Sequence, residues 1–459
     1  MPVNKKGNML TEGPLFKGIV LYTIPIIFTG LLQLFFNAAD LIVVGRFCGS
    51  LSVGAVGATG SITNLIVTLF MGLSVGAGVV VAQTYGQKDW ESVHRTVHTA
   101  IPTALVSGVI LTVVGVLFSK QFLILMGTPE NILELSSIYM KIYFGGITFN
   151  MLYNFSAAIL RAVGDTKGPL IFLTIAGVIN IILNCIFVVV FGMNVDGVAL
   201  ATTISQAISA ILVIRALMKR TDACRLVLKD LRFYGEQLKR ILIIGLPSGI
   251  NSAMYSISNT IIQSTINSFG DVVVSGSAAA ANIEGFVWIC LNSFQHTAVN
   301  YTGQNLGAGN LKRVKKTLWI CLGCVSVVGI LLGTSVYSIA PRLLSVYITD
   351  SVEAIGYGVT RMSYICLIYF LCGIMDVTTG GLRGMGASTV AMIISVIGVC
   401  GVRIAWIETI FRIEAYHTLD SLFFTYPLSW ILTFLAQLIA YIIVFNKMKK
   451  KTEKQNLTL

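Results

Sequence analysis

The sequence predicts an all-α membrane protein in which about twelve transmembrane helices form two pseudo-twofold-related six-helix bundles around a central cleft. Three observations support this fold class: the composition, the length of the apolar segments and an internal duplication. Of the 459 residues, 55% are hydrophobic and only 11% are charged, whereas about a quarter of the residues in a soluble protein are charged. The mean hydropathy of +0.82 also indicates that lipid is the main solvent.

The apolar segments are long enough to cross a bilayer, whose core is spanned by roughly 20 helical residues. Lipid leaves open backbone groups without partners, so these segments must be helices or a closed barrel, and their length without alternation excludes a barrel. The first apolar run is too long for a signal peptide and is expected to be retained. The predicted spans are 15–44, 53–83, 97–119, 133–158, 168–191, 196–218, 240–265, 276–302, 317–340, 354–380, 388–410 and 420–446.

The positions of the basic residues predict the orientation in the membrane. With a cytoplasmic N-terminus, about 25 of the 32 Lys and Arg residues lie in the termini and in loops on the same side. We therefore expect a multi-pass protein of the cell (cytoplasmic) membrane with both termini in the cytoplasm. The net charge of +12 is interpreted as an orientation signal beside anionic lipid, and nucleic acid is not an expected partner.

An internal duplication follows from residues that recur at an offset of about 221 to 222 positions. The pairs are Pro25 with Pro247, Asn37 with Asn259, Gln83 with Gln304, and Arg161 with Arg383. Six spans in each repeat start both repeats on the same side of the membrane, so the repeats are parallel. Two such lobes suit alternating access, because one bundle can rock against the other around a site near the midplane.

The lobe boundaries follow from the one long hydrophilic stretch between spans. Residues 1–218 are predicted to form the N-lobe and residues 240–446 the C-lobe. Residues 219–239 then form a cytoplasmic linker, and residues 447–459 form a basic cytoplasmic tail.

Four segments resemble the multidrug and toxic compound extrusion (MATE) family: QLFFNAADLIVVGRFCG, TGQNLGAGN, LRAVGDTKGP and YPLSWILT. The resemblance covers nearly the whole chain, with the segments in the family's order. It implies a V-shaped pair of six-helix lobes. It also implies a secondary antiporter that expels cationic or amphipathic organic compounds in exchange for Na⁺ or H⁺.

Ionisable groups deep inside a span cost at least about 2.5 kcal/mol each and usually mark an ion or substrate path. Asp40 is the first candidate. In the family pattern, an acid at this place works with polar residues of helices 5 and 6, which here are Asn180, Asn184 and Thr202. Asn180 and Asn184 share a helical face, so their oxygens can converge on one ion.

The coupling ion stays open between Na⁺ and H⁺. Many relatives that bind a cation in this lobe have aspartate where this chain has Asn184. One carboxylate with several neutral oxygens still suits a monovalent cation, and a proton needs Asp40 alone. Alternatively, Asn180, Asn184 and Thr202 serve only as interhelical hydrogen-bonding groups.

The second lobe carries two further acids, Glu284 and Asp376, which resemble family positions that attract a cationic substrate or carry a second proton. Arg403 is interpreted as the only deeply placed base. It either neutralises Asp376 or Glu284 in a structural ion pair or leaves them available, since an unpaired intramembrane Arg is very costly.

Other functions are less compatible with the sequence. A flippase for lipid-linked saccharides needs a basic cavity to bind the anionic pyrophosphate. The predicted spans instead contain three deep acids and one deep base, which disfavours this function. An ion channel lacks a filter-like sequence. An enzyme is not expected, because the four histidines are dispersed and His94 and His98 have no third metal ligand nearby in the sequence. Because a Walker-type motif is absent, ATP is not the expected energy source. We also expect no cofactor, no metal beyond Na⁺ at Asp40 and its polar partners, small organic substrates, and a monomer.

Overall fold

The computed structural model describes residues 10–349 and 351–457, and every element assigned there is a helix. This part of the chain separates into two compact units. The first contains Ile24–Gly249, and the second contains Pro14–Thr23 together with the described residues after Gly249.

The elements from the start of the chain to the linker are α1 (Leu15–Phe47), α2 (Ser50–Gly86), α3 (Trp90–Leu125), α4 (Glu130–Gly145), α5 (Ile147–Ala162), α6 (Lys167–Asn184), the π-helix η1 (Cys185–Val190), α7 (Val195–Met218) and the short 3₁₀ helix η2 (Leu228–Asp230). The later elements are α8 (Gly235–Asn267), α9 (Asp271–Gly307), α10 (Leu311–Ser338), α11 (Ala340–Leu344), α12 (Val352–Ile365), α13 (Phe370–Gly384), α14 (Ser388–Ser395), the π-helix η3 (Val396–Gly401), α15 (Val402–Glu408), the 3₁₀ helices η4 (Ile410–Arg412) and η5 (Glu414–Tyr416), and α16 (Leu419–Leu457).

Among the described residues, ten helices are long and apolar enough to cross a membrane. An eleventh span is formed if α12 and α13, which are bent by 46° relative to each other, count as one. The remaining predicted span, 133–158, is covered by α4 and α5. These two helices meet at Gly146, where glycine's low helix propensity favours a break. The structure therefore agrees with an all-α membrane protein of twelve predicted spans.

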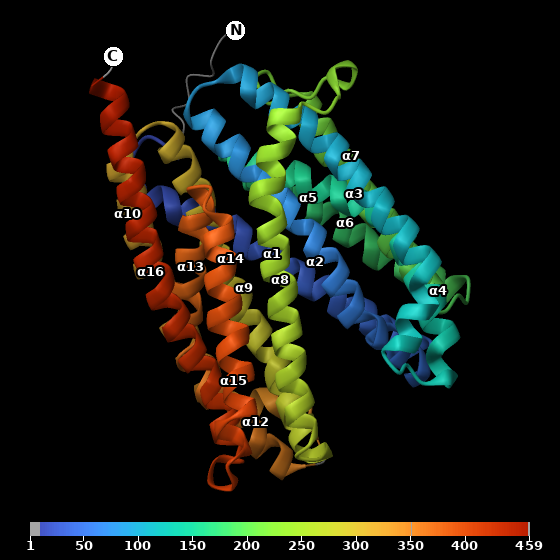
Figure 1. The fold of residues 1–459 in the computed structure, drawn as a ribbon. Coiled ribbons are helices and arrows are strands. Elements are labelled where there is room, and N and C mark those ends of the chain that lie inside the picture. Colours follow the sequence, from blue (N-terminus) through green and yellow to red (C-terminus); the bar gives the residue numbers. More distant parts are fainter. Residues whose placement is uncertain (1–9, 350, 458–459) are drawn as a thin grey trace. The chain divides into compact units, whose positions relative to one another are not determined.

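The two units repeat one packing pattern. In the first, α5 packs against α2, α3 and α7, and in the second, α13 packs against α9, α10 and α16 (Figure 1). The repeat aligns Arg161 of α5 with Arg383 of α13, so α5 corresponds to α13. In the same order along the chain, α2, α3 and α7 correspond to α9, α10 and α16. The duplication seen in the sequence is thus a duplication of a six-span bundle.

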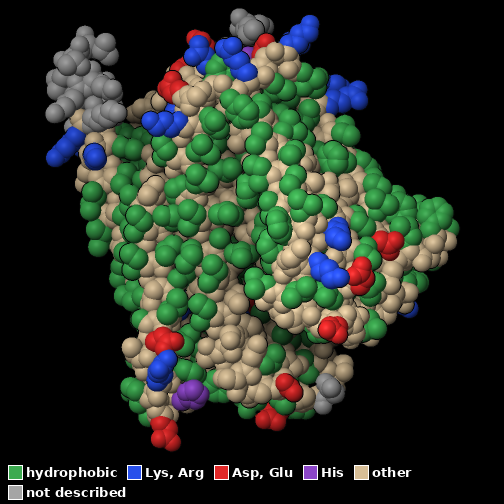
Figure 2. Space-filling view, turned by 45° about the vertical axis from the view of Figure 1, so that its right-hand side comes forward, with side chains coloured by type: hydrophobic (Ala, Val, Ile, Leu, Met, Phe, Trp, Pro, Cys, Tyr) green, Lys and Arg blue, Asp and Glu red, His purple; other side chains and the backbone are tan. Residues whose placement is uncertain are grey.

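The surface has the character expected of a lipid-exposed protein. On the face shown in Figure 2, apolar side chains are spread widely, and charged side chains gather in a few groups, most of them near the top and bottom of the view. Large apolar residues are widely exposed, for example Ile42 at 65% and Leu331 at 61%. In water an apolar surface of this extent would aggregate, whereas hydrocarbon solvates it.

Two long helices are divided between the units. The first part of α1 packs in the second unit, where Thr23 Oγ1 lies 2.8 Å from Thr297 Oγ1 of α9 and the rings of Tyr22 and Tyr301 meet edge to face. The first part of α8 packs in the first unit against α2. Each division lies close to a proline of the repeat, Pro25 or Pro247.

Glycines allow α2 and the first part of α8 to approach closely. A Cβ atom added to Gly72 would lie 2.1 Å from the backbone nitrogen of Gly249, and one added to Gly76 would lie 2.4 Å from the Ile241 carbonyl oxygen. Each helix therefore presents a small-xxx-small pattern, Gly72 with Gly76 and Gly245 with Gly249.

Replacement of Gly72 by Ala should therefore destabilise the protein. The methyl group collides with backbone atoms of α8, which cannot move aside like a flexible side chain, so a loss of about 1–3 kcal/mol is expected. Thermal unfolding in detergent micelles measures the effect. Gly60→Ala is the matched control in the same helix, because a Cβ there meets no atom within 4 Å. Equal unfolding temperatures for the two variants would contradict the close helix contact.

Candidate functional site

The first unit holds the cluster formed by Asp40, Asn180, Asn184 and Thr202, hereafter the Asp40 cluster. Asp40 lies on α1, Thr202 on α7, and both asparagines on the last two turns of α6. The α-helical hydrogen bonding of α6 ends at Asn184, and the π-helix η1 begins at the next residue. Short π-helical segments of this kind are frequent at functional sites, because they redirect side chains within a span.

The structure brings all four polar residues together. Asn184 Nδ2 donates to Asp40 Oδ1 at 2.5 Å and lies 3.3 Å from Asn180 Oδ1. Asn180 Nδ2 donates to Thr202 Oγ1 at 3.4 Å. The Thr202 hydroxyl lies 3.3 Å from Asp40 Oδ2 and 3.0 Å from the Val198 carbonyl oxygen, and its single proton can serve only one of them at a time.

The electrostatics of the Asp40 cluster are those of an uncompensated acid. Within the described residues, Asp40 forms no ion pair with a base, and its contacts are an amide and a hydroxyl. Asn180 and Asn184 are buried, and no donor from the described part of the chain reaches the Asn184 side-chain oxygen. A buried acceptor without a donor is costly in a protein interior. Carboxylate, amide and hydroxyl oxygens are also the ligands that hard cations prefer.

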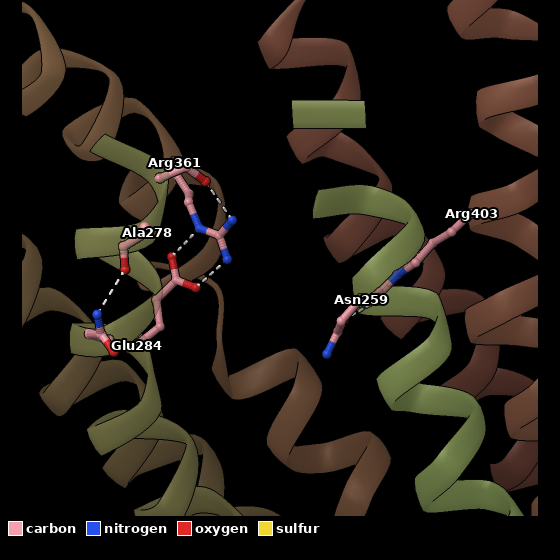
Figure 3. Close-up of polar contacts among 7 residues, drawn as sticks. Asn259, Ala278, Glu284, Arg361 and Arg403 are labelled. Atoms are coloured by element: carbon pink, nitrogen blue, oxygen red, sulfur yellow. Dashed lines mark hydrogen bonds and ion pairs between the residues drawn. The ribbon is translucent and has the colours of Figure 1, made fainter. Parts of the chain in front are cut away.

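In the second unit, Glu284 of α9 is paired with Arg361 of α12. Arg361 Nε and Nη2 donate to the two carboxylate oxygens at 3.0 and 2.9 Å, and Nη1 donates to Ser277 Oγ at 2.8 Å (Figure 3). Glu284 and Arg361 are 5% and 6% exposed, so both charges are withdrawn from water. This bidentate geometry is the strongest form of an Arg–carboxylate contact.

The interpretation of Arg403 as the only deeply placed base is wrong, because Arg361 is also buried. The pairing of Arg403 with Glu284, which the sequence left open, is not formed, because Glu284 is paired with Arg361. Arg361 lies inside the predicted span 354–380, about two turns from its start. This depth in the span indicates from the sequence that Arg361 is a second buried base. Its partner could not be read from the sequence, because the pair joins residues 77 positions apart.

Arg403 is instead held by neutral groups. Its Nη1 lies 3.1 Å from Asn259 Oδ1 (Figure 3). Its Nε donates to Ser429 Oγ at 3.2 Å, and Nη1 also lies 3.5 Å from Ser258 Oγ. The guanidinium carbon lies 4.3 Å from the centre of the Tyr426 ring. Within the part of the chain that the structure describes, Arg403 forms no ion pair, so it does not neutralise Asp376 either.

Asp376 of α13 is the other deep acid of the second unit and is 7% exposed. It lies near Asn292 and Arg383, one an amide and the other a buried base. Arg383 lies in the last turn of α13 and is 7% exposed. The two deep acids of the second unit therefore have different surroundings, a bidentate ion pair for Glu284 and an amide with a more distant guanidinium for Asp376.

The two neighbouring histidines of α3 have a third group beside them that the sequence did not indicate. Asp230 of η2 lies 3.4 Å from His94 Nε2. The His98 ring is already engaged on both sides, since Nδ1 donates to the His94 carbonyl and Nε2 accepts from the Val227 backbone N–H at 3.0 Å. The arrangement fastens the segment after α7 to α3, and it leaves His98 without a free ligand atom.

Comparisons with known proteins agree with this architecture. The family model MatE matches residues 25–186 and 247–407, one match in each repeat. The probable multidrug resistance protein YpnP of Bacillus subtilis is 28% identical over 393 residues, which cover 85% of this chain and 87% of that protein. The multidrug export protein MepA of Staphylococcus aureus is 24% identical over 84% of this chain and 85% of its own length.

Solved structures show the same fold. The crystal structure of MATE in complex with MaL6 superimposes with a TM-score of 0.90 at 21% identity, over 97% of this chain and 100% of that chain. An outward-facing multidrug resistance MATE family transporter of the MOP superfamily matches with a TM-score of 0.85 at 22% identity. With two family matches that together cover more than half of its residues, the chain belongs to the MatE family, the multidrug and toxic compound extrusion family that its sequence resembles.

Proposed function

We propose that the protein is a secondary multidrug efflux antiporter that expels organic, often cationic compounds in exchange for Na⁺ or H⁺. The observation that carries the proposal is the Asp40 cluster. Among the residues that the structure describes, the Asp40 carboxylate has no basic partner and the buried Asn184 amide oxygen beside it has no donor, and one bound cation would satisfy both. A positive ion is therefore the natural occupant of this cluster.

The exchange follows from the charge on Asp40. With the cation bound, the cluster is electrically neutral, and with the cation released it carries a negative charge that is costly inside a span. An ion gradient then biases the two states, because a ligand shifts an equilibrium by its difference in affinity for them. The state that has released the ion then binds the organic compound. Because the ion gradient favours one direction of ion movement, the compound is carried in the opposite direction and is expelled.

The substrate class is proposed from the relatives. YpnP is named a probable multidrug resistance protein and MepA a multidrug export protein. A flippase for lipid-linked saccharides remains the second candidate, because the second unit holds three buried arginines. We favour the antiporter, since the Arg361 guanidinium is engaged by Glu284 and does not offer its charge to a pyrophosphate.

Transport in proteoliposomes tests the proposal. The purified protein is reconstituted, a fluorescent organic cation is loaded, and a Na⁺ gradient or a pH gradient of equal size is imposed. We expect one of the two gradients to drive dye movement, and an ionophore that collapses that gradient to stop it. Protein-free liposomes provide the background. Dye movement that stays at this background under both gradients would overturn the proposal.

A further inference from the structure

Arg403 lies among the helices that correspond, through the repeat, to those of the Asp40 cluster. In the first unit the cluster is built by α1, α6 and α7. Their counterparts in the second unit are α8, the segment from α14 to α15, and α16. The partners of Arg403 come from these same helices, with Ser258 and Asn259 on α8 and Ser429 on α16.

The correspondence is close along the chain. Asn259 pairs with Asn37, which lies one helical turn before Asp40. Both sites also adjoin a π-helix, since η1 begins directly after Asn184, and η3 ends two residues before Arg403. Each unit therefore has a polar site at equivalent helices, beside the same type of irregularity.

The charges of the two sites are reversed. In the first unit the Asp40 carboxylate contacts the Asn184 amide and the Thr202 hydroxyl, and it has no ion pair with a base among the described residues. In the second unit a guanidinium is surrounded by two serine hydroxyls, an amide oxygen and the face of Tyr426. All of these groups present negative partial charge to a cation, and they reduce the cost of holding one inside a span.

We infer that Arg403 acts as a built-in cation in the second unit's counterpart of the Asp40 cluster. A tethered guanidinium occupies the site permanently, so no ion from solution binds there and the counterpart takes no part in ion exchange. This inference rests on the proposed function, in which the first unit's cluster holds the mobile cation. It makes the ion-binding capacity of the two repeats unequal, with Arg403 as the residue that blocks the second site.

Vacating the site tests the inference. Arg403→Ala leaves the acceptor groups around an unoccupied space, so free guanidinium at millimolar concentration should bind there and raise the unfolding temperature of the purified variant. We expect the variant to unfold roughly 5 °C below wild type and guanidinium chloride to restore part of this loss, increasingly with its concentration. Choline chloride at equal concentration should have no such effect.

Three controls separate charge from packing. Arg403→Met fills the volume without a charge and should not respond to guanidinium, and Arg403→Lys should stay close to wild type. Arg412→Ala removes an exposed arginine of the same segment and should change nothing, because its side chain is 70% exposed. These measurements of stability do not depend on transport, so they can fail while the proposed antiport succeeds, or the reverse.

The inference is overturned by either of two results. One is an equal shift of the unfolding temperature by guanidinium and choline in Arg403→Ala. The other is an Arg403→Met variant that is as stable as wild type. If Arg403→Ala does not yield folded protein, the comparison of Arg403→Met with Arg403→Lys decides the question.

Discussion

Replacement of Asp40 by Asn is expected to abolish gradient-driven dye efflux in proteoliposomes while the protein still folds. The amide has nearly the same shape as the carboxylate and can still contact Asn184 and Thr202, so the packing of α1, α6 and α7 is kept. It carries no charge and cannot compensate a cation, and it releases no proton. Efflux should fall to the level of protein-free liposomes under either gradient.

A matched control for this prediction is Asp271→Asn. Asp271 is an exposed acid in the first turn of α9, so the same chemical change occurs there outside the Asp40 cluster. Its efflux should equal that of wild type. Undiminished exchange by Asp40→Asn, with the unfolding temperature unchanged, would remove Asp40 from the coupling mechanism.

Replacement of Arg361 by Ala is expected to cost about 3–5 kcal/mol of stability, because it leaves the buried Glu284 carboxylate without its partner. The Ser277 hydroxyl would also lose its donor. Glu284→Ala should be similarly destabilising, since it strands the guanidinium. Both losses can be measured from the unfolding of purified protein in detergent micelles.

The double variant Glu284→Leu/Arg361→Met distinguishes a mutual pair from two separate contributions. With both charges gone and the volume kept, we expect most of the stability to return, as it does when buried ion pairs are replaced by apolar residues. A double-mutant cycle with the single variants Glu284→Leu and Arg361→Met then gives a coupling energy well above the few tenths of a kcal/mol that independent sites show. Additive losses would show that the two side chains do not depend on each other.

The contrast between Asp40 and Glu284 is central to the proposed function. Both are carboxylates inside predicted spans, and the hydropathy of the sequence does not indicate which of them is paired with a base. In the structure Asp40 has no ion pair with a base among the described residues, whereas Glu284 accepts two hydrogen bonds from Arg361. For this reason we assign the mobile cation to Asp40 and a structural role to Glu284.

The sequence by itself determined the features that depend on neighbouring residues and on solvent. Long apolar segments set the spans, because hydrocarbon admits only backbone that satisfies its own hydrogen bonds. Pro25 and Arg161 recur as Pro247 and Arg383 at a nearly constant offset, and this recurrence revealed the two repeats. The spacing of four residues in one helix placed Asn180 beside Asn184, and the depth of Asp40 in an apolar span marked it as a candidate. The family resemblance linked Asp40 with both asparagines and Thr202, and the structure brings these four residues together.

Only the tertiary structure decided which buried charges meet. Arg361 reaches Glu284 because α12 packs against α9. The Arg403 side chain of α15 meets Asn259 of α8, a residue 144 positions away in the sequence. Asp230 approaches His94 in the same non-local way. Hydropathy and helical period act over a few turns of one helix, whereas the partner of a buried charge depends on how separate helices pack, and no local pattern in the sequence encodes that choice.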